Sequence, residues 1–330
     1  MHPDEIRLDQ SHIDNAQRIL HASGIMESDH LDAGEVAHFA RQLEYVKAAT
    51  YDVEYTRLKT LELIPLDTSA PEGTESVTYQ QWDEVGMARI VANMADDLPE
   101  VDVFSREFTS KVVSLGDAYK WTIQDVRRAM MAGSDFMLRK TRTARLAIDR
   151  RIDQIGATGA TEVGTVGIVN HPNVPEVVLP NPGTFDTLTP AEVLENLNFL
   201  AQSIVTLTND VERPNTMVLA TGPYGHIASE PMLGGNGTDT ILTVFLRNSP
   251  YITTVDQWTH LDGAGDSGAD RILCYDKSDR VLSYNIPLLF EQLPPQPKAL
   301  SFLVPCHSRV GVVEIHYPLA LAYGDVVPGT

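Results

Sequence analysis

The sequence predicts an α+β fold, and three stretches of the chain support this prediction. Residues 76–121 show no helical period and are rich in β-branched and aromatic residues, which is typical of extended strands. A long helix is predicted next, over residues 122–156, because apolar residues recur there at helical spacing. Residues 188–265 then alternate short helices with single strands, as expected of an α/β domain of modest size.

The overall composition is that of a globular protein. The chain has 330 residues, enough for two domains, of which 43% are hydrophobic and 21% charged. Its formal net charge of −20 opposes general nucleic-acid binding, because contact with phosphates requires a basic surface. An acidic wall can still enclose nucleic acid without adhering to it. The apolar runs are far shorter than the roughly twenty residues of a membrane span, so no membrane segment is predicted.

Residues 1–50 are predicted to form a helical arm. Asp32 is a plausible N-cap, and apolar residues follow it at helical spacing. These apolar residues are Val36, Phe39, Leu43 and Val46. One face of the arm therefore requires burial, against its own body or against a neighbouring copy. The polar, acidic N-terminus lacks the apolar region of a secretory signal, so we expect cytosolic synthesis.

The stretch at 76–121 is predicted to be an extended ribbon. It follows an irregular segment, residues 51–75, that ends in the turn-rich sequence TSAPEGTES. Folded back near residues 96–99, the ribbon would have arms of roughly twenty residues. An isolated two-stranded ribbon is only marginally stable in water. We therefore expect it to lie on another copy of the same chain.

The acidic centre of the ribbon, ADDLPEVD, is predicted to be an exposed tip. Proline and clustered carboxylates disfavour the interior of a strand. The adjacent carboxylates of Asp96 and Asp97 would point to opposite faces of an extended chain, which argues against a shared catalytic or metal-binding role. The residues expected to contact a partner are Asp96, Asp97, Leu98, Pro99, Glu100, Val101 and Asp102.

The long helix is predicted to begin at Ile123, since Thr122 and Asp125 have the spacing of a capping box. Gly133 and Ser134 are expected to interrupt it. Beyond this break one face is apolar and the opposite face is basic. The apolar face contains Met137, Ala144, Ile148, Ile152 and Ile155, and the basic face contains Arg139, Arg142 and Arg150. The basic face either makes ion pairs in solvent or faces a lumen or a neighbouring subunit.

A second domain is predicted over residues 188–265, after a loop region at 157–188. Thr189, Pro190 and Glu192 supply the N-cap, first-turn proline and N3 acid of its first helix. Further elements are expected as a strand at 216–220, helices near 222–229 and 239–247, and a strand near 251–254. From Arg271 onward the chain is strand-like again, and these late strands are expected to return to the sheet of the first domain.

Two glycine-rich segments of this domain match no ligand-binding motif. The sequence GGNG, residues 234–237, lacks the Lys and Ser/Thr of a phosphate loop. The sequence DGAGDSGAD, residues 262–270, lacks the spacing of a calcium loop. Both are predicted to be mobile loops.

Motifs of catalytic chemistry are absent from the sequence. The ten histidines are scattered, and HExxH, CxxC and GxSxG do not occur. The two cysteines, Cys274 and Cys306, are predicted to be buried reduced thiols. Cys306 adjoins His307, but neighbours on a strand face opposite ways. We therefore predict no enzyme, no cofactor and no metal site, and expect function to lie in surfaces.

Two long runs resemble the major capsid proteins of tailed bacteriophages. The first is LELIPLDTSAPEGTESVTYQQWDEVGMARIVANMADDLPEVDV, followed by SLGDAYKWTIQDVRRAMMAG. The second, FEQLPPQPKALSFLVPCHSRVGVVEIHYPLALAYGD, resembles one branch of that family. The resemblance covers about residues 39–325 and implies the Hong Kong 97 type capsid fold.

The resemblance also implies how the chain is divided. The N-terminal arm would be residues 1–50 and the extended loop residues 76–121. The peripheral domain would comprise residues 51–75, 122–187 and 266–330, with a spine helix at 135–156, and the axial domain would be residues 188–265. Loops expected to approach a local five- or six-fold axis contain Gly234, Gly235, Asn236, Gly237, Gly263 and Gly265.

The function implied by the resemblance is assembly. The protein would form pentamers and hexamers of an icosahedral shell around double-stranded DNA, without sequence-specific DNA binding. Separate scaffolding, portal and decoration proteins are candidate partners. The protein would be located in the virion after assembly in the host cytoplasm.

Two alternatives remain open at this point. An encapsulin is a cellular compartment of the same fold that holds a cargo enzyme, and fold alone does not separate it from a phage capsid. An acidic two-domain α/β enzyme, with a site between its domains, would instead be a monomer or a small oligomer.

Overall fold

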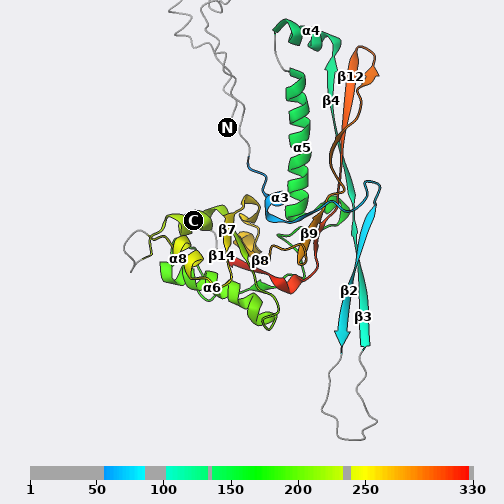
Figure 1. The fold of residues 1–330 in the computed structure, drawn as a ribbon. Helices are drawn as coiled ribbons and strands as arrows, with labels where there is room; N and C mark the ends of the chain where they lie inside the picture. Colours follow the sequence, from blue (N-terminus) through cyan, green and yellow to red (C-terminus); the bar gives the residue numbers. More distant parts are fainter. Residues whose placement is uncertain (1–55, 86–101, 133–135, 233–238, 327–330) are drawn as a thin grey trace, which may run out of the picture. The chain divides into compact units, whose positions relative to one another are not determined.

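The computed structural model describes residues 56–85, 102–132, 136–232 and 239–326. Apart from Thr56, these residues belong to a single unit, Arg57–Thr330. The predicted helical arm at 1–50, residues 96–101 of the predicted ribbon tip at 96–102 and the GGNG segment lie outside the described residues, whereas Asp102 is described. The described elements mix helices with sheets, which agrees with the predicted α+β class (Figure 1).

The largest described sheet has the strand order β5-β14-β8-β6-β7. Its strands are β5 (Glu176–Val177), β14 (Leu321–Val326), β8 (Asp270–Tyr275), β6 (Thr216–Leu219) and β7 (Thr254–Gln257). Strand β8 is antiparallel to both of its neighbours, β14 and β6. At the edges, β5 pairs in parallel with β14 and β7 pairs in parallel with β6.

The position of β8 and β14 corrects the expectation that all late strands return to the first domain. Both strands share the sheet of β6 and β7. Residues 271–275 of β8 are all buried, so this run has apolar partners on both faces of the sheet. Its hydrophobicity marks an inner strand, but the sequence does not indicate which sheet contains it.

Three helices cover one face of this sheet: α6 (Pro190–Leu207), α7 (Thr221–Ser229) and α8 (Ile241–Asn248). Helix α6 begins as predicted, because the amide of Thr189 donates to the Glu192 carboxylate at 2.8 Å and the Thr189 hydroxyl accepts from the Glu192 amide. The predicted strand at 216–220 is confirmed as β6. Strand β7 begins at Thr254, about three residues later than expected from pattern alone.

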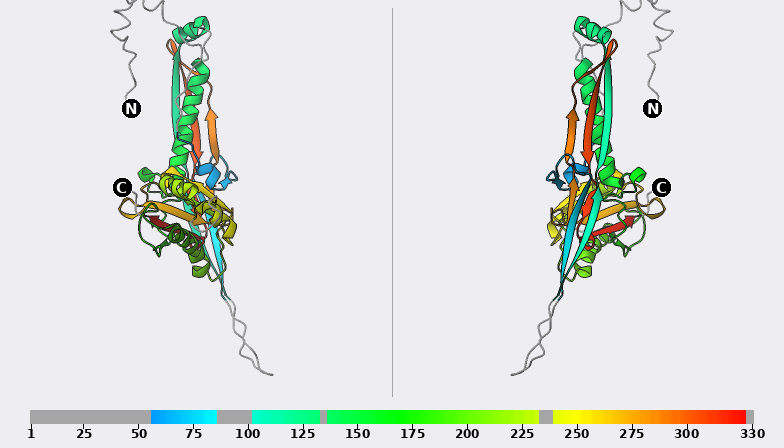
Figure 2. Two further views of the ribbon diagram at one scale, coloured as in Figure 1. Left: turned by 90° about the vertical axis from the view of Figure 1, so that its left-hand side faces the viewer. Right: turned by 90° about the vertical axis from the view of Figure 1, so that its right-hand side faces the viewer.

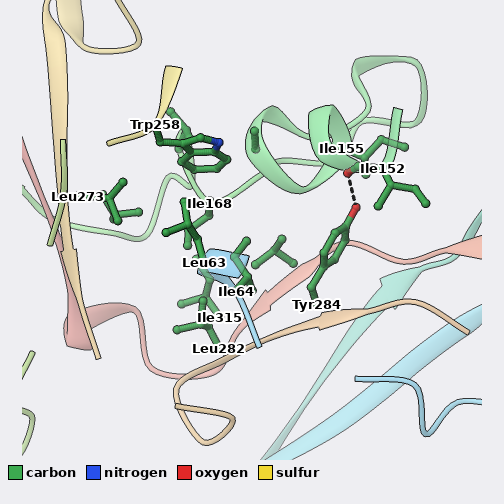
Figure 3. Packing of buried hydrophobic residues seen from close by; sticks show 14 of the residues in the cluster. Leu63, Ile64, Ile152, Ile155, Ile168, Trp258, Leu273, Leu282, Tyr284 and Ile315 are labelled. Atoms are coloured by element: carbon green, nitrogen blue, oxygen red, sulfur yellow. Dashed lines mark hydrogen bonds between the residues drawn. The ribbon is translucent and has the colours of Figure 1, made fainter. Parts of the chain in front are cut away.

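The opposite face of the sheet packs against α5 (Phe136–Thr158) and α3 (Thr60–Leu63) in a second hydrophobic cluster. Ala144, Ile148, Ile152 and Ile155 of α5 are all buried there, which confirms the predicted apolar stripe for the residues whose side chains are described. Figure 3 shows this cluster, in which the Tyr284 hydroxyl donates to the Ile152 carbonyl at 2.7 Å.

Helix α4 (Ile123–Ala132) begins at the predicted residue. The Asp125 amide donates to the Thr122 hydroxyl at 3.1 Å, and the Thr122 amide donates to the Asp125 carboxylate at 3.1 Å. This reciprocal pair is the predicted capping box. Helices α4 and α5 are separate, and the predicted break residues Gly133 and Ser134 lie outside the described residues.

A second sheet is built around β12 (Ser301–Val310). Strand β4 (Val113–Thr122) pairs with β12 along its whole length, and β10 (Leu288–Gln292) and β11 (Gln296–Lys298) pair with its other edge. Buried residues alternate along most of β12, and Cys306 and Val310 join the cluster that contains α5. Trp121 stacks on Phe302 across the β4–β12 pair, with ring centroids 4.3 Å apart.

The expected ribbon is therefore shorter than 76–121. Strands β2 (Ser76–Val85) and β3 (Asp102–Lys111) form a two-stranded sheet of their own, and only Val112 separates β3 from β4. The second arm thus leaves the ribbon after Lys111 and continues into the β12 sheet. Figures 1 and 2 show the ribbon and β4 extending in opposite directions from this point.

The remaining described elements are short. A three-stranded sheet has the order β1-β9-β13, formed by β1 (Leu66–Asp67), β9 (Leu282–Asn285) and β13 (Val313–Ile315). The 3₁₀ turns are η1 (Thr161–Val163), η2 (Thr259–Leu261), η3 (Asp266–Gly268) and η4 (Pro318–Ala320). The predicted loop region at 157–188 contains the end of α5, η1 and the two residues of β5, and is otherwise irregular.

Candidate functional site

The β2–β3 ribbon exposes large apolar side chains on both of its faces. Trp82 is 62% exposed, and Phe104 is 55% exposed. In the antiparallel register Trp82 lies opposite Ser105 and Phe104 lies opposite Asp83, which places the two rings on different faces. Exposed aromatic residues on a ribbon that is marginally stable alone indicate a contact surface.

Cross-strand contacts hold the ribbon together. The hydroxyls of Thr78 and Thr109 are 2.9 Å apart, and the Gln80 amide donates to Glu107 at 2.7 Å. Tyr79 stacks on Phe108 with ring centroids 5.2 Å apart. Each such pair contributes only about 0.2–1 kcal/mol. These contacts define the register of the strands but leave the apolar faces uncovered.

The base of the ribbon is fixed to the body by side chains from β12 and β13. Arg309 donates to the Thr74 carbonyl at 2.7 Å, and the Ser110 hydroxyl donates to the carboxylate of Glu314. Tyr79 meets His316 edge to face, with ring centroids 4.6 Å apart. A groove of about 640 Å³ lies beside this base, between the ribbon, β13 and residues 163–166.

His171 and His316 both line this groove and are both half-buried. Burial lowers the pKa of each imidazole, although Glu314 and Asp67 oppose the shift at His316. The folded state therefore binds these protons less readily than the unfolded state, whose histidines titrate near about 6.5. Their contribution to stability is complete above that pH and is lost as the pH falls below it and through the lowered pKa of the folded state.

We expect the variant His171→Gln/His316→Gln to lose less stability than the wild type between pH 7.5 and pH 5.5. Urea unfolding of the unassembled protein at the two pH values measures this difference. His307→Gln is the control, because His307, on β12, is not among the residues that line this groove. Equal acid sensitivity in the double variant and the wild type would contradict the assignment.

A polar junction connects the first described helix to α5 and η2. The Thr60 amide donates to Asp153 Oδ1 at 2.9 Å, and His260 Nε2 lies 2.7 Å from Asp153 Oδ2. Burial disfavours the charge of Asp153, but the hydrogen bonds from His260 and Thr60 outweigh it and lower the pKa of this carboxyl. The segment that follows residues 1–55 is thus fixed to the body at Thr60.

Carboxylates bonded to backbone amides organise the segment at 262–270. Gly263 donates to Asp270 at 2.9 Å, Asp266 donates to Asp325 at 3.0 Å, and Gly263 has a φ of +65°. A Cβ at Gly265 would lie 2.6 Å from the Asp325 side chain, so a larger residue there would displace this carboxylate. This bonding differs from the mobile loop expected from the glycines. Gly234, Gly235, Asn236 and Gly237 lie outside the described residues.

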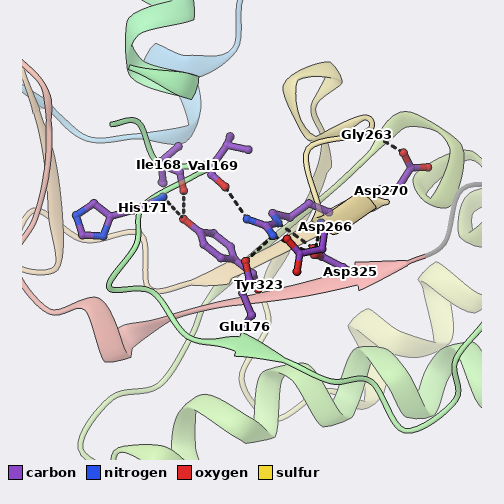
Figure 4. A network of polar contacts seen from close by, with 10 residues as sticks. Ile168, Val169, His171, Glu176, Gly263, Asp266, Asp270, Tyr323 and Asp325 are labelled. Atoms are coloured by element: carbon purple, nitrogen blue, oxygen red, sulfur yellow. Dashed lines mark hydrogen bonds and ion pairs between the residues drawn. The ribbon is translucent and has the colours of Figure 1, made fainter. Parts of the chain in front are cut away.

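Arg271 lies at the centre of the same network, and its partners Val169, Glu176 and Asp325 are labelled in Figure 4. Its guanidinium makes two bonds to Asp325, at 2.8 and 2.9 Å, one to Glu176 at 2.7 Å and one to the Val169 carbonyl at 3.0 Å. Burial opposes its charge, but Asp325 and then Glu176 more than compensate and raise the pKa of Arg271. The network joins β8, β14 and β5 to the loop before β5.

The predicted basic face of α5 is exposed at Arg139, Arg142 and Arg150. Neighbouring arginines of the same helix take part in ion pairs, Arg151 with Glu162 at 2.8 Å and Arg145 with Asp149 at 3.7 Å. This placement is compatible with each of the roles expected for the basic face.

The described residues give little support for a reactive thiol, a metal site or a membrane span. Cys274 and Cys306 are free and buried, as predicted, and burial raises the pKa of both thiols. No group of three or more His, Cys, Asp or Glu side chains among the described residues is placed to hold a metal ion. None of the described helices is long and apolar enough to cross a membrane.

The decisive comparison is with protein families. The family model described as major capsid protein matches residues 86–327. The chain belongs to the major capsid protein family. No curated protein sequence matches the chain.

Solved capsid structures share the fold of this capsid protein. The capsid of Myoviridae phage XM1 matches with a TM-score of 0.78 at 17% identity, covering 91% of this chain and 100% of that chain. A structure from Mycobacterium phage Ogopogo matches with a TM-score of 0.57 at 14% identity, covering 91% and 100%. The predicted Hong Kong 97 type fold of tailed-bacteriophage major capsid proteins is thereby confirmed.

The capsid protein is thus a shell-forming structural protein of a bacteriophage, and the encapsulin and enzyme alternatives are less favoured. The acidic ribbon tip was predicted from the sequence, whereas Trp82, Val103 and Phe104, which are exposed on the described part of the ribbon, were not predicted as contact residues. A tryptophan among polar residues, in QQWDEV, was the available signal.

Proposed function

We propose that this capsid protein forms pentamers and hexamers of an icosahedral shell that encloses double-stranded DNA. The β2–β3 ribbon carries the proposal, because its exposed apolar faces require a covering partner. The net charge of −20 suits a wall that encloses DNA without binding its sequence. The role is structural, with no catalytic step and no cofactor, and the virion is its location after assembly in the host cytoplasm.

The proposed division of the chain follows the resemblance, with one adjustment. Residues 1–50 are the arm, the ribbon is the extended loop, and residues 188–265 form most of the axial domain. The peripheral domain contains 51–75 and 122–187 with α5 as its spine, and much of 266–330. We assign β8 and β14 to the axial domain, because they share a sheet with β6 and β7.

The proposed contacts between copies use three surfaces. The ribbon lies across a neighbouring subunit, with its tip at 96–102 in the contact. The loops that contain residues 234–237 and 263–265 approach the axis of a ring of copies, and such rings form through head-to-tail contacts. The face of α5 with Arg139, Arg142 and Arg150 meets the lumen or a neighbour. Scaffolding, portal and decoration proteins are further proposed partners.

The test of this proposal is the size and content of the particles. We expect the purified full-length chain to form closed shells, observed by sedimentation velocity and negative-stain electron microscopy. Particles from phage-infected cells should contain double-stranded DNA. A chain that remains a monomer or a small oligomer at all concentrations would contradict shell formation, and particles that hold a cargo protein would indicate a compartment instead.

A further inference from the structure

Helices α4 and α5 concentrate positive charge in an acidic chain. Residues 123–158, which contain both helices, have eight arginines and lysines against four aspartates, whereas the whole chain has a net charge of −20. The remainder of the chain is therefore even more acidic than this total. A polyanion is attracted to this segment and repelled by the rest of the protein.

The aspartates of this segment do not cancel its charge. Asp125 caps the start of α4. Asp153 is 5% exposed and is bonded to side chains and backbone of other elements. Asp149 lies 3.7 Å from Arg145 on the same helix. Each of these three aspartates thus has a partner, and the segment as a whole stays positive.

The arginines of the basic face form a row along α5. Arg139, Arg142 and Arg150 are exposed on the side of the helix opposite the buried Ile148 and Ile152. The apolar side of α5 is buried in the subunit core, and the helix runs alongside β4 and β12 (Figure 2). The row from Arg139 to Arg150 is about 16 Å long at helical rise. This length matches about five base pairs of duplex DNA, whose phosphates repeat about every 3.4 Å along each strand.

The side chains of the basic face fit phosphate better than they fit a protein surface. Between Arg139 and Arg150 no large apolar side chain is exposed, whereas the centre of a protein–protein interface is apolar. Contacts with DNA are polar and strongly positive. All three cations of the row are arginines, and the forked guanidinium can bind two phosphate oxygens at once. Duplex DNA is therefore favoured over a neighbouring subunit.

We propose that the basic face of α5 lines the lumen of the shell and binds phosphates of the enclosed duplex DNA without reading its sequence. This inference rests on the proposed shell function and chooses between the two roles proposed for this face. Three phosphate contacts per copy are weak and salt-dependent. Because the acidic remainder of each copy repels DNA, the duplex would touch the wall along these helices and not elsewhere.

Duplex binding by the unassembled full-length chain tests the proposal. The probe is a short fluorescent duplex of mixed sequence, and anisotropy is measured over a range of salt concentrations, with the protein kept below the concentration needed for assembly. The test variant is Arg139→Gln/Arg142→Gln/Arg150→Gln. We expect its affinity at low salt to fall about tenfold or more, and the slope of log affinity against log salt to become shallower by about 2 to 3, since each phosphate contact contributes about 0.9.

The matched control changes the net charge equally at other positions. Arg57→Gln/Arg213→Gln/Arg247→Gln removes three exposed cations outside α5, and it should keep the wild-type salt slope. Arg139→Lys/Arg142→Lys/Arg150→Lys retains the charge of the row and should keep most of the slope. Circular dichroism checks that every variant is folded. Equal losses in the test variant and the control, or no binding by the wild type at low salt, would overturn the proposal.

Assembled particles test the lumenal position of the basic face. Closed wild-type shells should not bind duplex added from outside, because the basic face is then enclosed. Binding by closed shells would place the face on the exterior and contradict the proposal. The folded test variant should still form shells of normal size, and its failure to assemble would show that the face meets a neighbouring subunit instead.

Failure of the shell function would give a different result. If the wild-type chain forms no shells under any condition, the proposed function is wrong. The duplex assay uses the unassembled chain, so it still decides whether the basic face binds phosphate. Normal shells combined with no duplex binding would refute this inference alone.

Discussion

Deletion of residues 93–104 is expected to leave a folded protein that no longer assembles. The deletion removes the tip and the ladder partners of Asp83, Glu84 and Val85 on β3. Of this range the structure describes Asp102, Val103 and Phe104, and neither hydrophobic cluster contains any of the three, so we expect the core to be unaffected. The ribbon would lose the apolar and acidic groups that we assign to the contact between copies.

Sedimentation velocity should show only small species for this deletion variant, with a thermal midpoint close to that of the unassembled wild-type chain. Replacement of the same residues by a Gly/Ser segment of equal length is the control for loop length. It should also fail to assemble if the side chains make the contact. Shells of normal size from the deletion variant would disprove the role of the ribbon.

Arg271→Met is expected to destabilise the folded protein by about 2 kcal/mol, less than the loss of one partner from a fully buried ion pair. The Arg271 side chain is 5% exposed, whereas Asp325 is 21% and Glu176 is 51% exposed, so water partly compensates the two carboxylates for the loss of their shared cation. The loop at 262–270 should also loosen, because Asp325 accepts the hydrogen bond from Asp266.

Urea unfolding in the background of the 93–104 deletion measures this effect without interference from assembly. Arg271→Lys keeps the charge but not the paired geometry and should give an intermediate loss. Arg213→Met is the surface control, since its ion pair with Asp210 is exposed on both sides and should contribute little to stability. An equally small loss for Arg271→Met would show that the network does not stabilise the fold.

Local signals in the sequence predicted the helices well. The capping boxes at Thr122 and Thr189 define the starts of α4 and α6, and both depend on residues three positions apart. The apolar stripe of α5 was predicted for the same reason, since Ile148, Ile152 and Ile155 repeat at helical spacing. Contacts within one or two helical turns are visible in a sequence.

Contacts between distant segments were not predictable in this way. The pairing of β8 with β6 joins residues more than fifty positions apart, and nothing in RILCY distinguishes one sheet from another. Thr60 meets Asp153 and His260 only after folding. A groove of about 530 Å³ at the end of β4 is lined by both Lys120 and Lys298, which the sequence separates widely. Its residues could be identified as charged, but not as neighbours.

The single residue between β3 and β4 has a mechanical consequence. If neighbouring copies hold the ribbon tips, tension in the wall passes along the backbone through Val112 directly into β4. Strand β4 is paired with β12 at ten positions, and a pull along the strand strains these pairs together instead of opening them one after another. The sheet would therefore resist outward pressure on the shell, because paired β-strands are hardest to separate when they are pulled along their length.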